Sequence, residues 1–129
     1  MYKYNVDVDF NIATSHGLIA SKITKGSRIL EFGCGNGYLA AYAKSTLECS
    51  VTGIDISAEA IKTASAHLEQ GIVANVEEKE WEQELLCKEF DVIIFSDVLE
   101  HLHAPADLLR RSLAYLKPDG KILCAVSKS

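Results

Sequence analysis

The sequence has little of several features that define whole classes of protein. Lys and Arg number 13 against 18 Asp and Glu, a net charge of −5, so the basic surface that binds nucleic acid is not expected. No apolar run is long enough to span a bilayer, and the N-terminus has no apolar signal-peptide segment. These absences favour a cytoplasmic protein without nucleic-acid or membrane partners.

Cysteine spacing argues against two kinds of stabilising site. No two of the four cysteines form a C-x-x-C pair, so neither a zinc site nor a disulfide framework is expected, and reduced thiols are the default interpretation. The four are Cys34, Cys49, Cys87 and Cys124.

What is present fits one small domain. The chain has 129 residues, 48% of them hydrophobic, and a mean hydropathy of +0.07, which is enough for a core. We expect a single domain over residues 1–129. Residues 1–25 would form an arm and a helix over Phe10–Ile23, and residues 26–129 would form the core.

The most informative stretch is Arg28–Tyr38. A short apolar run typical of a buried strand is followed by Gly33, Gly35 and Gly37, and then by a helical pattern over about 38–45. Strand, glycine turn and helix form a typical nucleotide-binding loop, because glycine permits a close ligand approach and the helix N-terminus offers free N–H groups. The dinucleotide fingerprint G-x-G-x-x-G is not met, since Tyr38 replaces its third glycine, which disfavours a nicotinamide dehydrogenase.

Strands and helices alternate through the rest of the chain. Further strands are predicted at Ser50–Asp55, 71–74, 90–95 and 121–126, with a turn at 117–120 before the last. The pattern predicts an α/β, Rossmann-like, doubly wound parallel sheet of about five strands, with helices on both faces. Asp55 ends the second strand about twenty residues past the glycines, where a ribose-binding carboxylate belongs.

Five segments resemble the class I S-adenosylmethionine-dependent methyltransferases, in the branch that acts on small molecules. They are residues 31–37, 51–57, 74–77, 90–101 and 116–123, in the family's order. The resemblance implies the strand order 3-2-1-4-5 and S-adenosylmethionine or S-adenosylhomocysteine as the cofactor.

The resemblance also implies a role for individual residues. Glu31 and the glycine loop would hold the methionine part of the cofactor, Asp55 the ribose, and Ile56 and Val76 the two faces of the adenine. Asn75 stands where the family usually has an Asp near the adenine amino group, and Ser96 would line the methionine end. The expected cofactor-binding residues are therefore Glu31, Gly33, Cys34, Gly35, Gly37, Asp55, Ile56, Asn75, Val76 and Ser96, with Cys34 as a small side chain filling the loop.

A second group of polar residues follows the fourth strand. If helical, Asp97, Glu100 and His101 would share one face and could bind a metal, as in metal-assisted small-RNA 2′-O-methyltransferases. That family needs a further His well downstream, and none follows His103. The favoured interpretation is a polar loop without metal that lines the methyl-transfer pocket, with His101 as a candidate base for a hydroxyl acceptor.

The function expected from these observations is methyl transfer to a small-molecule acceptor. The alternative is a non-catalytic or partial cofactor-binding module, cut from a longer chain. The family's last β-hairpin has no counterpart after the fifth strand, so we expect an exposed strand edge that could pair two copies into a homodimer. We also expect the chain to bind S-adenosylhomocysteine but to methylate poorly alone.

Overall fold

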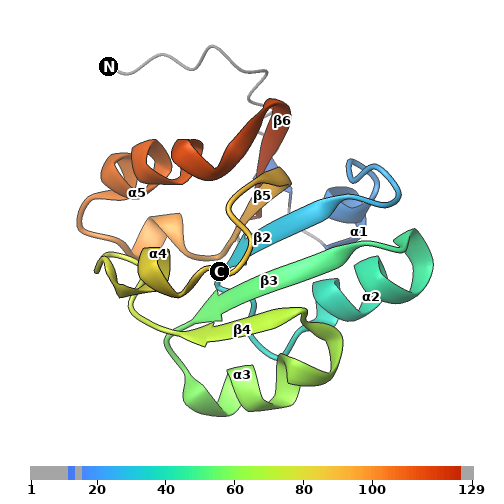
Figure 1. The fold of residues 1–129 in the computed structure, drawn as a ribbon, viewed down its shortest axis with the longest axis horizontal. Coiled ribbons are helices and arrows are strands. Elements are labelled where there is room, and N and C mark those ends of the chain that lie inside the picture. Colours follow the sequence, from blue (N-terminus) through green and yellow to red (C-terminus); the bar gives the residue numbers. More distant parts are fainter. Residues whose placement is uncertain (1–11, 14–15, 126–129) are drawn as a thin grey trace.

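The computed structural model describes residues 12–13 and 16–125, and its strands and helices alternate along the chain (Figure 1). The strands are β1 (Ile12–Ala13), β2 (Arg28–Phe32), β3 (Ser50–Asp55), β4 (Gln70–Val73), β5 (Phe90–Ser96) and β6 (Leu116–Ala125). The helices are α1 (His16–Ala20), α2 (Tyr38–Leu47), α3 (Ala58–Ala64), α4 (Glu80–Glu84) and α5 (Pro105–Ser112). The 3-10 turns are η1 (Ser65–His67), η2 (Leu99–His101) and η3 (Leu113–Tyr115).

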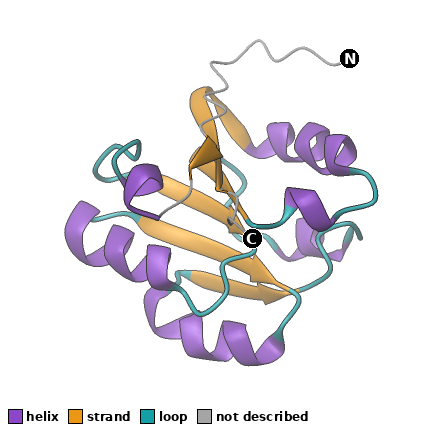
Figure 2. Cartoon of the chain, turned by 180° about the vertical axis from the view of Figure 1, so that it is seen from behind, coloured by secondary structure: helices purple, strands orange, loops and turns teal. Residues whose placement is uncertain are grey.

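The sheet has the predicted parallel arrangement. The strand order is β1-β6-β5-β2-β3-β4, and every pairing is parallel. Without β1 this is the expected order 3-2-1-4-5, with helices on both faces (Figure 2). The chain reverses its direction of winding between β2 and β5, and ligands of such sheets bind beyond the carboxyl ends of the strands at that point.

The N-terminal segment differs from its prediction. A helix was expected over Phe10–Ile23, but among the described residues of this range only α1 is helical, and Ile12–Ala13 pairs as a parallel strand with Cys124 and Ala125. The helix prediction is wrong at β1 because pairing with β6 satisfies backbone groups that a helix end would leave free. The edge of β6, expected to be open, is therefore occupied at this point, and strand addition by a second copy here would have to displace β1.

The predicted turn at 117–120 lies inside a strand instead. Leu116 pairs with Phe90 and Lys121 with Val92, so four residues of β6 oppose Asp91 alone. This bulge suits Pro118, because a proline has no N–H to donate to a ladder. The predicted strand end at Val126 lies outside the described residues.

Two apolar layers cover the two faces of the sheet. Side chains from α1 and α2 pack on one face, and side chains from α4 and α5 pack on the other. The second layer centres on Phe32, whose ring stacks on Phe95 and meets the edge of Trp81, each at a centroid distance of 5.0 Å. No helix in the described part has the length and apolar character that crossing a membrane requires.

We predict that Phe32→Ala lowers the free energy of unfolding by about 3–5 kcal/mol, because it leaves a cavity under two aromatic rings. Leu86→Ala is the control, since Leu86 is 82% exposed and should change stability by less than about 0.5 kcal/mol. Urea denaturation measures both. Similar losses in the two variants would contradict the placement of Phe32 in the core.

Candidate functional site

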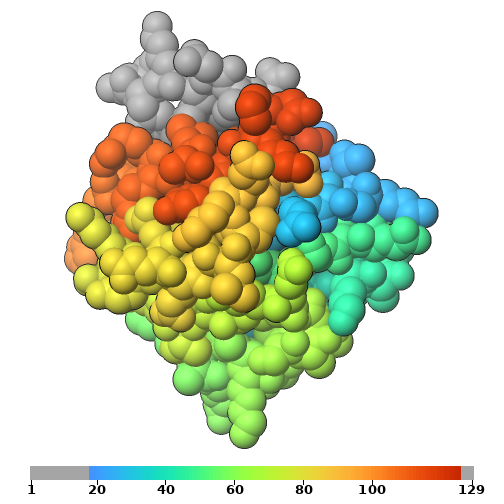
Figure 3. Space-filling model, viewed as in Figure 1, coloured from blue at the N-terminus to red at the C-terminus, as the bar shows by residue number. Residues whose placement is uncertain are grey.

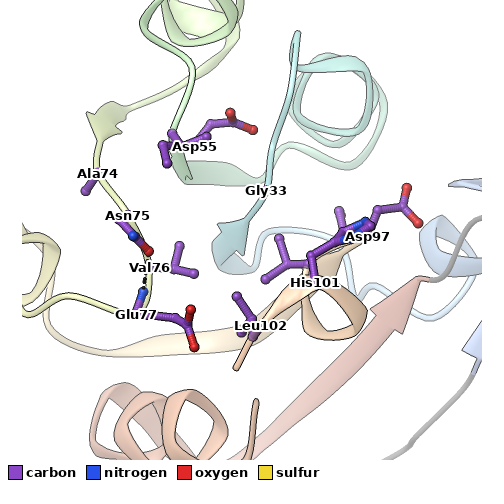
Figure 4. A pocket seen from close by; sticks show the side chains of 12 residues that line it. Gly33, Asp55, Ala74, Asn75, Val76, Glu77, Asp97, His101 and Leu102 are labelled. Atoms are coloured by element: carbon purple, nitrogen blue, oxygen red, sulfur yellow. Dashed lines mark hydrogen bonds between the residues drawn. The ribbon is translucent and has the colours of Figure 1, made fainter. Parts of the chain in front are cut away.

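The carboxyl ends of four strands surround one cavity of about 490 Å³. In the space-filling view, the gold residues that lead into β5 lie between the green β3–β4 half and the red atoms of β6 (Figure 3). The lining side chains come from the ends of β2 to β5 and the loops that follow them (Figure 4). They are Gly33, Asp55, Ile56, Ala74, Asn75, Val76, Glu77, Ser96, Asp97, Val98, His101 and Leu102.

The three glycines of the loop serve two different purposes. All have positive φ, at 78° for Gly33, 54° for Gly35 and 88° for Gly37. A Cβ on Gly33 would lie 2.5 Å from the Ser96 carbonyl oxygen, and one on Gly37 would lie 2.9 Å from the Ala64 Cβ. A Cβ on Gly35 would meet no atom within 4 Å. Packing therefore requires glycine at the first and third positions, while the middle one leaves open space beside the loop.

Asp55 ties this loop to the neighbouring strand. Its Oδ2 accepts a hydrogen bond from the Gly35 N–H at 2.9 Å, and its Oδ1 accepts one from the Ser57 N–H at 2.9 Å. Ser57 in turn caps α3 by accepting from the Ala60 N–H. Each Asp55 oxygen keeps a further lone pair, so the carboxylate can accept from a ligand while it holds the loop.

Glu31 is a buried acid, and none of the described residues forms an ion pair with it. Ser96 Oγ donates to Glu31 Oε2 at 2.7 Å, while Oε1 has no hydrogen-bond partner among the described residues. Burial, and secondarily the negative charge of Asp55, raise the pKa of Glu31 to about 7, although the Ser96 hydrogen bond lowers it. An unpaired oxygen on a nearly fully buried carboxylate indicates a missing donor.

The loop after β4 forms a wall of the cavity. Asn75 Oδ1 accepts from the Glu77 N–H at 3.0 Å, which fixes a tight turn. The buried Trp81 donates from Nε1 to the Val76 carbonyl oxygen at 2.9 Å. Across the cavity mouth, Ile56 is 71% exposed and offers an apolar surface. Ile56 and Val76 therefore provide apolar contacts suited to a flat ring.

The loop after β5 does not form the helix that a shared metal face would need. Asp97 has φ +53° and precedes η2, so Asp97, Glu100 and His101 do not follow one helical turn. Within the part of the chain that the structure describes, no three His, Cys, Asp or Glu side chains are grouped to hold a metal. His101 lines the cavity with a largely exposed imidazole.

The structure brings together most of the predicted residues. Gly33, Asp55, Ile56, Asn75, Val76, Ser96 and His101 line the cavity. Glu31, Cys34, Gly35 and Gly37 lie outside the lining. Cys34 is buried with its sulfur packed against Gly53, and burial raises the pKa of its thiol to about 12, which suits a filler. Glu77 and Leu102 were not predicted, and their only sequence signal was position shortly after a predicted strand end.

Comparison with known proteins gives one consistent family. A profile described as a methyltransferase domain matches residues 11–129. The ubiquinone biosynthesis O-methyltransferase of Maricaulis maris (strain MCS10) is 36% identical over 117 residues, covering 88% of this chain and 46% of that protein. The chain spans less than half the length of the first curated relatives it matches.

Solved structures show the same fold. The plantazolicin methyltransferase BpumL, in complex with a monoazolic desmethylPZN analogue and SAH, is 28% identical with a TM-score of 0.64, covering 84% of this chain and 41% of that one. The cyclase SpnF is 22% identical with a TM-score of 0.69, covering 84% and 42%. The similarity to SpnF concerns the fold alone.

We predict that Glu31 makes the protein less stable as pH rises. Its native pKa of about 7 lies above the ordinary 4.5, so between these values the unfolded chain binds fewer protons than the native one. The contribution of protonated Glu31 to the free energy of unfolding is complete below about pH 4.5 and is lost as the pH rises through about 7. Relative to Glu31→Gln, wild type should lose about 2 kcal/mol of unfolding free energy between pH 5 and 8.

Urea denaturation of both proteins across this pH range measures the difference. Parallel pH profiles for wild type and Glu31→Gln would show that the carboxyl titrates normally in the native state.

Proposed function

Because the chain belongs to the methyltransferase-domain family, we propose that it binds S-adenosylmethionine and transfers the methyl group to a small-molecule acceptor. The observation that carries the proposal is the unpaired Glu31 oxygen beside an open glycine loop that Asp55 holds in place. A carboxylate in that position fits an ammonium donor, which the methionine part of this cofactor carries. The relatives' names and the SAH complex of BpumL support the same choice.

The residues of the cavity fit the parts of the cofactor. Asp55 would accept hydrogen bonds from the two ribose hydroxyls through its remaining lone pairs. Ile56 and Val76 would contact the adenine, with Asn75 near its amino group. Glu31, fixed by Ser96, would accept from the ammonium.

The chemistry requires positioning more than acid or base strength. When bound, S-adenosylmethionine supplies an electrophilic methyl group on its sulfonium. The chain's own groups would hold the donor in line with the acceptor. His101, at the opposite side of the cavity from Asp55 (Figure 4), would accept the proton of an acceptor hydroxyl. The O-methyltransferase names of the relatives favour such a hydroxyl acceptor.

A second candidate is a cofactor-binding module that does not methylate alone. The observation that favours it is the length of the relatives, of which this chain spans less than half. Binding and turnover distinguish the two functions. Calorimetric titration with S-adenosylhomocysteine should give binding, and titration with NAD should give none. Binding of NAD instead would contradict both candidates, whereas binding without methyl transfer to any hydroxylated acceptor would favour the module.

We predict that Asp55→Ala weakens S-adenosylhomocysteine binding by about 1–3 kcal/mol, roughly fivefold to 150-fold, because it removes acceptors for the ribose and releases the Gly35 N–H. Glu59→Ala, an exposed acid in the first turn of α3, removes the same charge nearby and is the control. Calorimetry measures both. Equal affinities in the two variants would remove Asp55 from the site.

We predict that Gly35→Val abolishes S-adenosylhomocysteine binding while the sheet still forms, because its side chain would fill the open space beside the loop. Gly26→Val is a matched control. Gly26 also has a positive φ, at 82°, and a Cβ there would also meet no atom within 4 Å, but it lies before β2 and away from the cavity. Both variants should lose similar stability, and only Gly35→Val should lose binding. Retained affinity in folded Gly35→Val would contradict the prediction.

A further inference from the structure

A single carboxylate joins the cavity wall after β4 to the loop after β5. Glu77 Oε2 accepts hydrogen bonds from the backbone N–H groups of His103 at 2.9 Å and Ala104 at 3.0 Å. Ala104 is the N-cap residue of α5 and has no side chain that could cap the helix. Glu77, which lines the cavity, thus supplies the hydrogen-bond acceptor for the start of α5, although it lies 27 residues away from Ala104 in the sequence.

These hydrogen bonds fix one end of a loop that enters the site. The other end is held by the Asp97 N–H, which donates to the Ala125 carbonyl oxygen at 2.8 Å. Between these two anchors, His101 and Leu102 line the cavity. Figure 4 shows the Glu77 carboxylate on the same side of the cavity as Leu102. The position of the loop over residues 97–104 therefore depends on Glu77 at its C-terminal end.

A residue of α5, Arg111, also contacts the segment that carries Glu77. Arg111 donates from its guanidinium to the Glu77 carbonyl oxygen at 3.2 Å and to Glu82 Oε2 at 2.7 Å. The same guanidinium lies 5.4 Å from the centroid of Trp81, whose indole N–H holds the Val76 carbonyl. Both ends of α5 therefore contact the segment after β4, which would contact the adenine. Ala104 makes the contact at the start of the helix, and Arg111 makes it near the end.

We propose that Glu77 is a positioning residue that sets the distance between the nucleoside side of the cavity and the His101–Leu102 loop. The proposal rests on the proposed function, because it assigns the methionine end of the cofactor to the Ser96–Asp97 side of this loop. Glu77 would act through the backbone N–H groups of His103 and Ala104, which its Oε2 holds, and not as a catalytic group. Loss of its carboxylate oxygen would release the loop while leaving Asp55, Ile56 and Val76 in place.

Two ligands separate positioning from a general structural role. S-adenosylhomocysteine spans both sides of the cavity, whereas adenosine lacks the methionine end and needs only the nucleoside side. In Glu77→Ala, the affinity for S-adenosylhomocysteine should fall about tenfold, with the affinity for adenosine within about threefold of wild type. Glu77→Asp keeps the charge but withdraws the oxygen by one methylene, and it should behave like Glu77→Ala.

Two further variants serve as controls. Glu77→Gln keeps an acceptor oxygen at the same reach and should restore S-adenosylhomocysteine binding to within about threefold. Glu78→Ala removes an equal charge from the next, exposed residue and should bind both ligands like wild type. Hydrogen exchange should show faster exchange of the His103 and Ala104 amides in Glu77→Ala and Glu77→Asp only.

Three results would overturn the proposal: equal losses for both ligands in Glu77→Ala, no loss for either, or a loss in Glu77→Gln as large as in Glu77→Ala. Failure of the proposed function looks different, because wild type itself would then not bind S-adenosylhomocysteine. If Glu77→Ala does not fold, the comparison of Glu77→Asp with Glu77→Gln still tests the role of the oxygen.

Discussion

The carboxylate of Asp55 is the contact on which the geometry of the site depends. It accepts one backbone N–H from the glycine loop, at Gly35, and one from the turn that starts α3, at Ser57. A loop with three left-handed glycines has few side chains to hold it, so its conformation must be fixed from outside. Asp55 does this from the neighbouring strand, and the same residue faces the cavity. In the proposed function, loop geometry and ligand binding would therefore be coupled through one side chain.

The electrostatics of the site suit the cationic ligand that the proposed function requires. Glu31 lies near the end of β2 and Asp55 ends the neighbouring β3; burial, and to a lesser extent the charge of Asp55, raise the pKa of Glu31. A buried carboxyl with a pKa of about 7 carries a proton for part of the time at neutral pH. An ammonium against Glu31 Oε1 would stabilise the ionised form, so binding of the proposed cofactor would release that proton. The burial that raises the pKa of Glu31 thus has two consequences. It makes the protein less stable at high pH, and it would favour a cationic ligand.

Local patterns predicted the parts of the fold that depend on local sequence. β3 has the predicted bounds, and β2 occupies the apolar run predicted to precede Gly33, because each is a short apolar run that ends on or beside an acid and a turn. The carboxyl ends of parallel strands meet at one edge, so the convergence of Asp55, Asn75 and Ser96 also followed from the order of elements. The predicted roles of these residues in binding stay predictions.

Features that depend on distant partners could not be predicted in this way. Ile12 forms a strand because Cys124 lies beside it, and the bulge at Pro118 exists because Asp91 is the only residue opposite. The contact between Glu77 and Ala104 joins segments that no periodicity relates. Each of these contacts involves at least one backbone group, whose partner the side-chain pattern does not encode.

The cavity has two sides that are built in different ways. The nucleoside side is built by β3, β4 and their loops, which sequence patterns locate well. The opposite side is built by one loop, over residues 97–104, that has little regular structure and is anchored at its ends by contacts to β6 and Glu77. Because loops of this kind have the lowest local stability in a fold, changes in acceptor choice can accumulate there without loss of the sheet. In the proposed function, the half built by β3 and β4 would hold the methyl donor, and the anchored loop would select the acceptor.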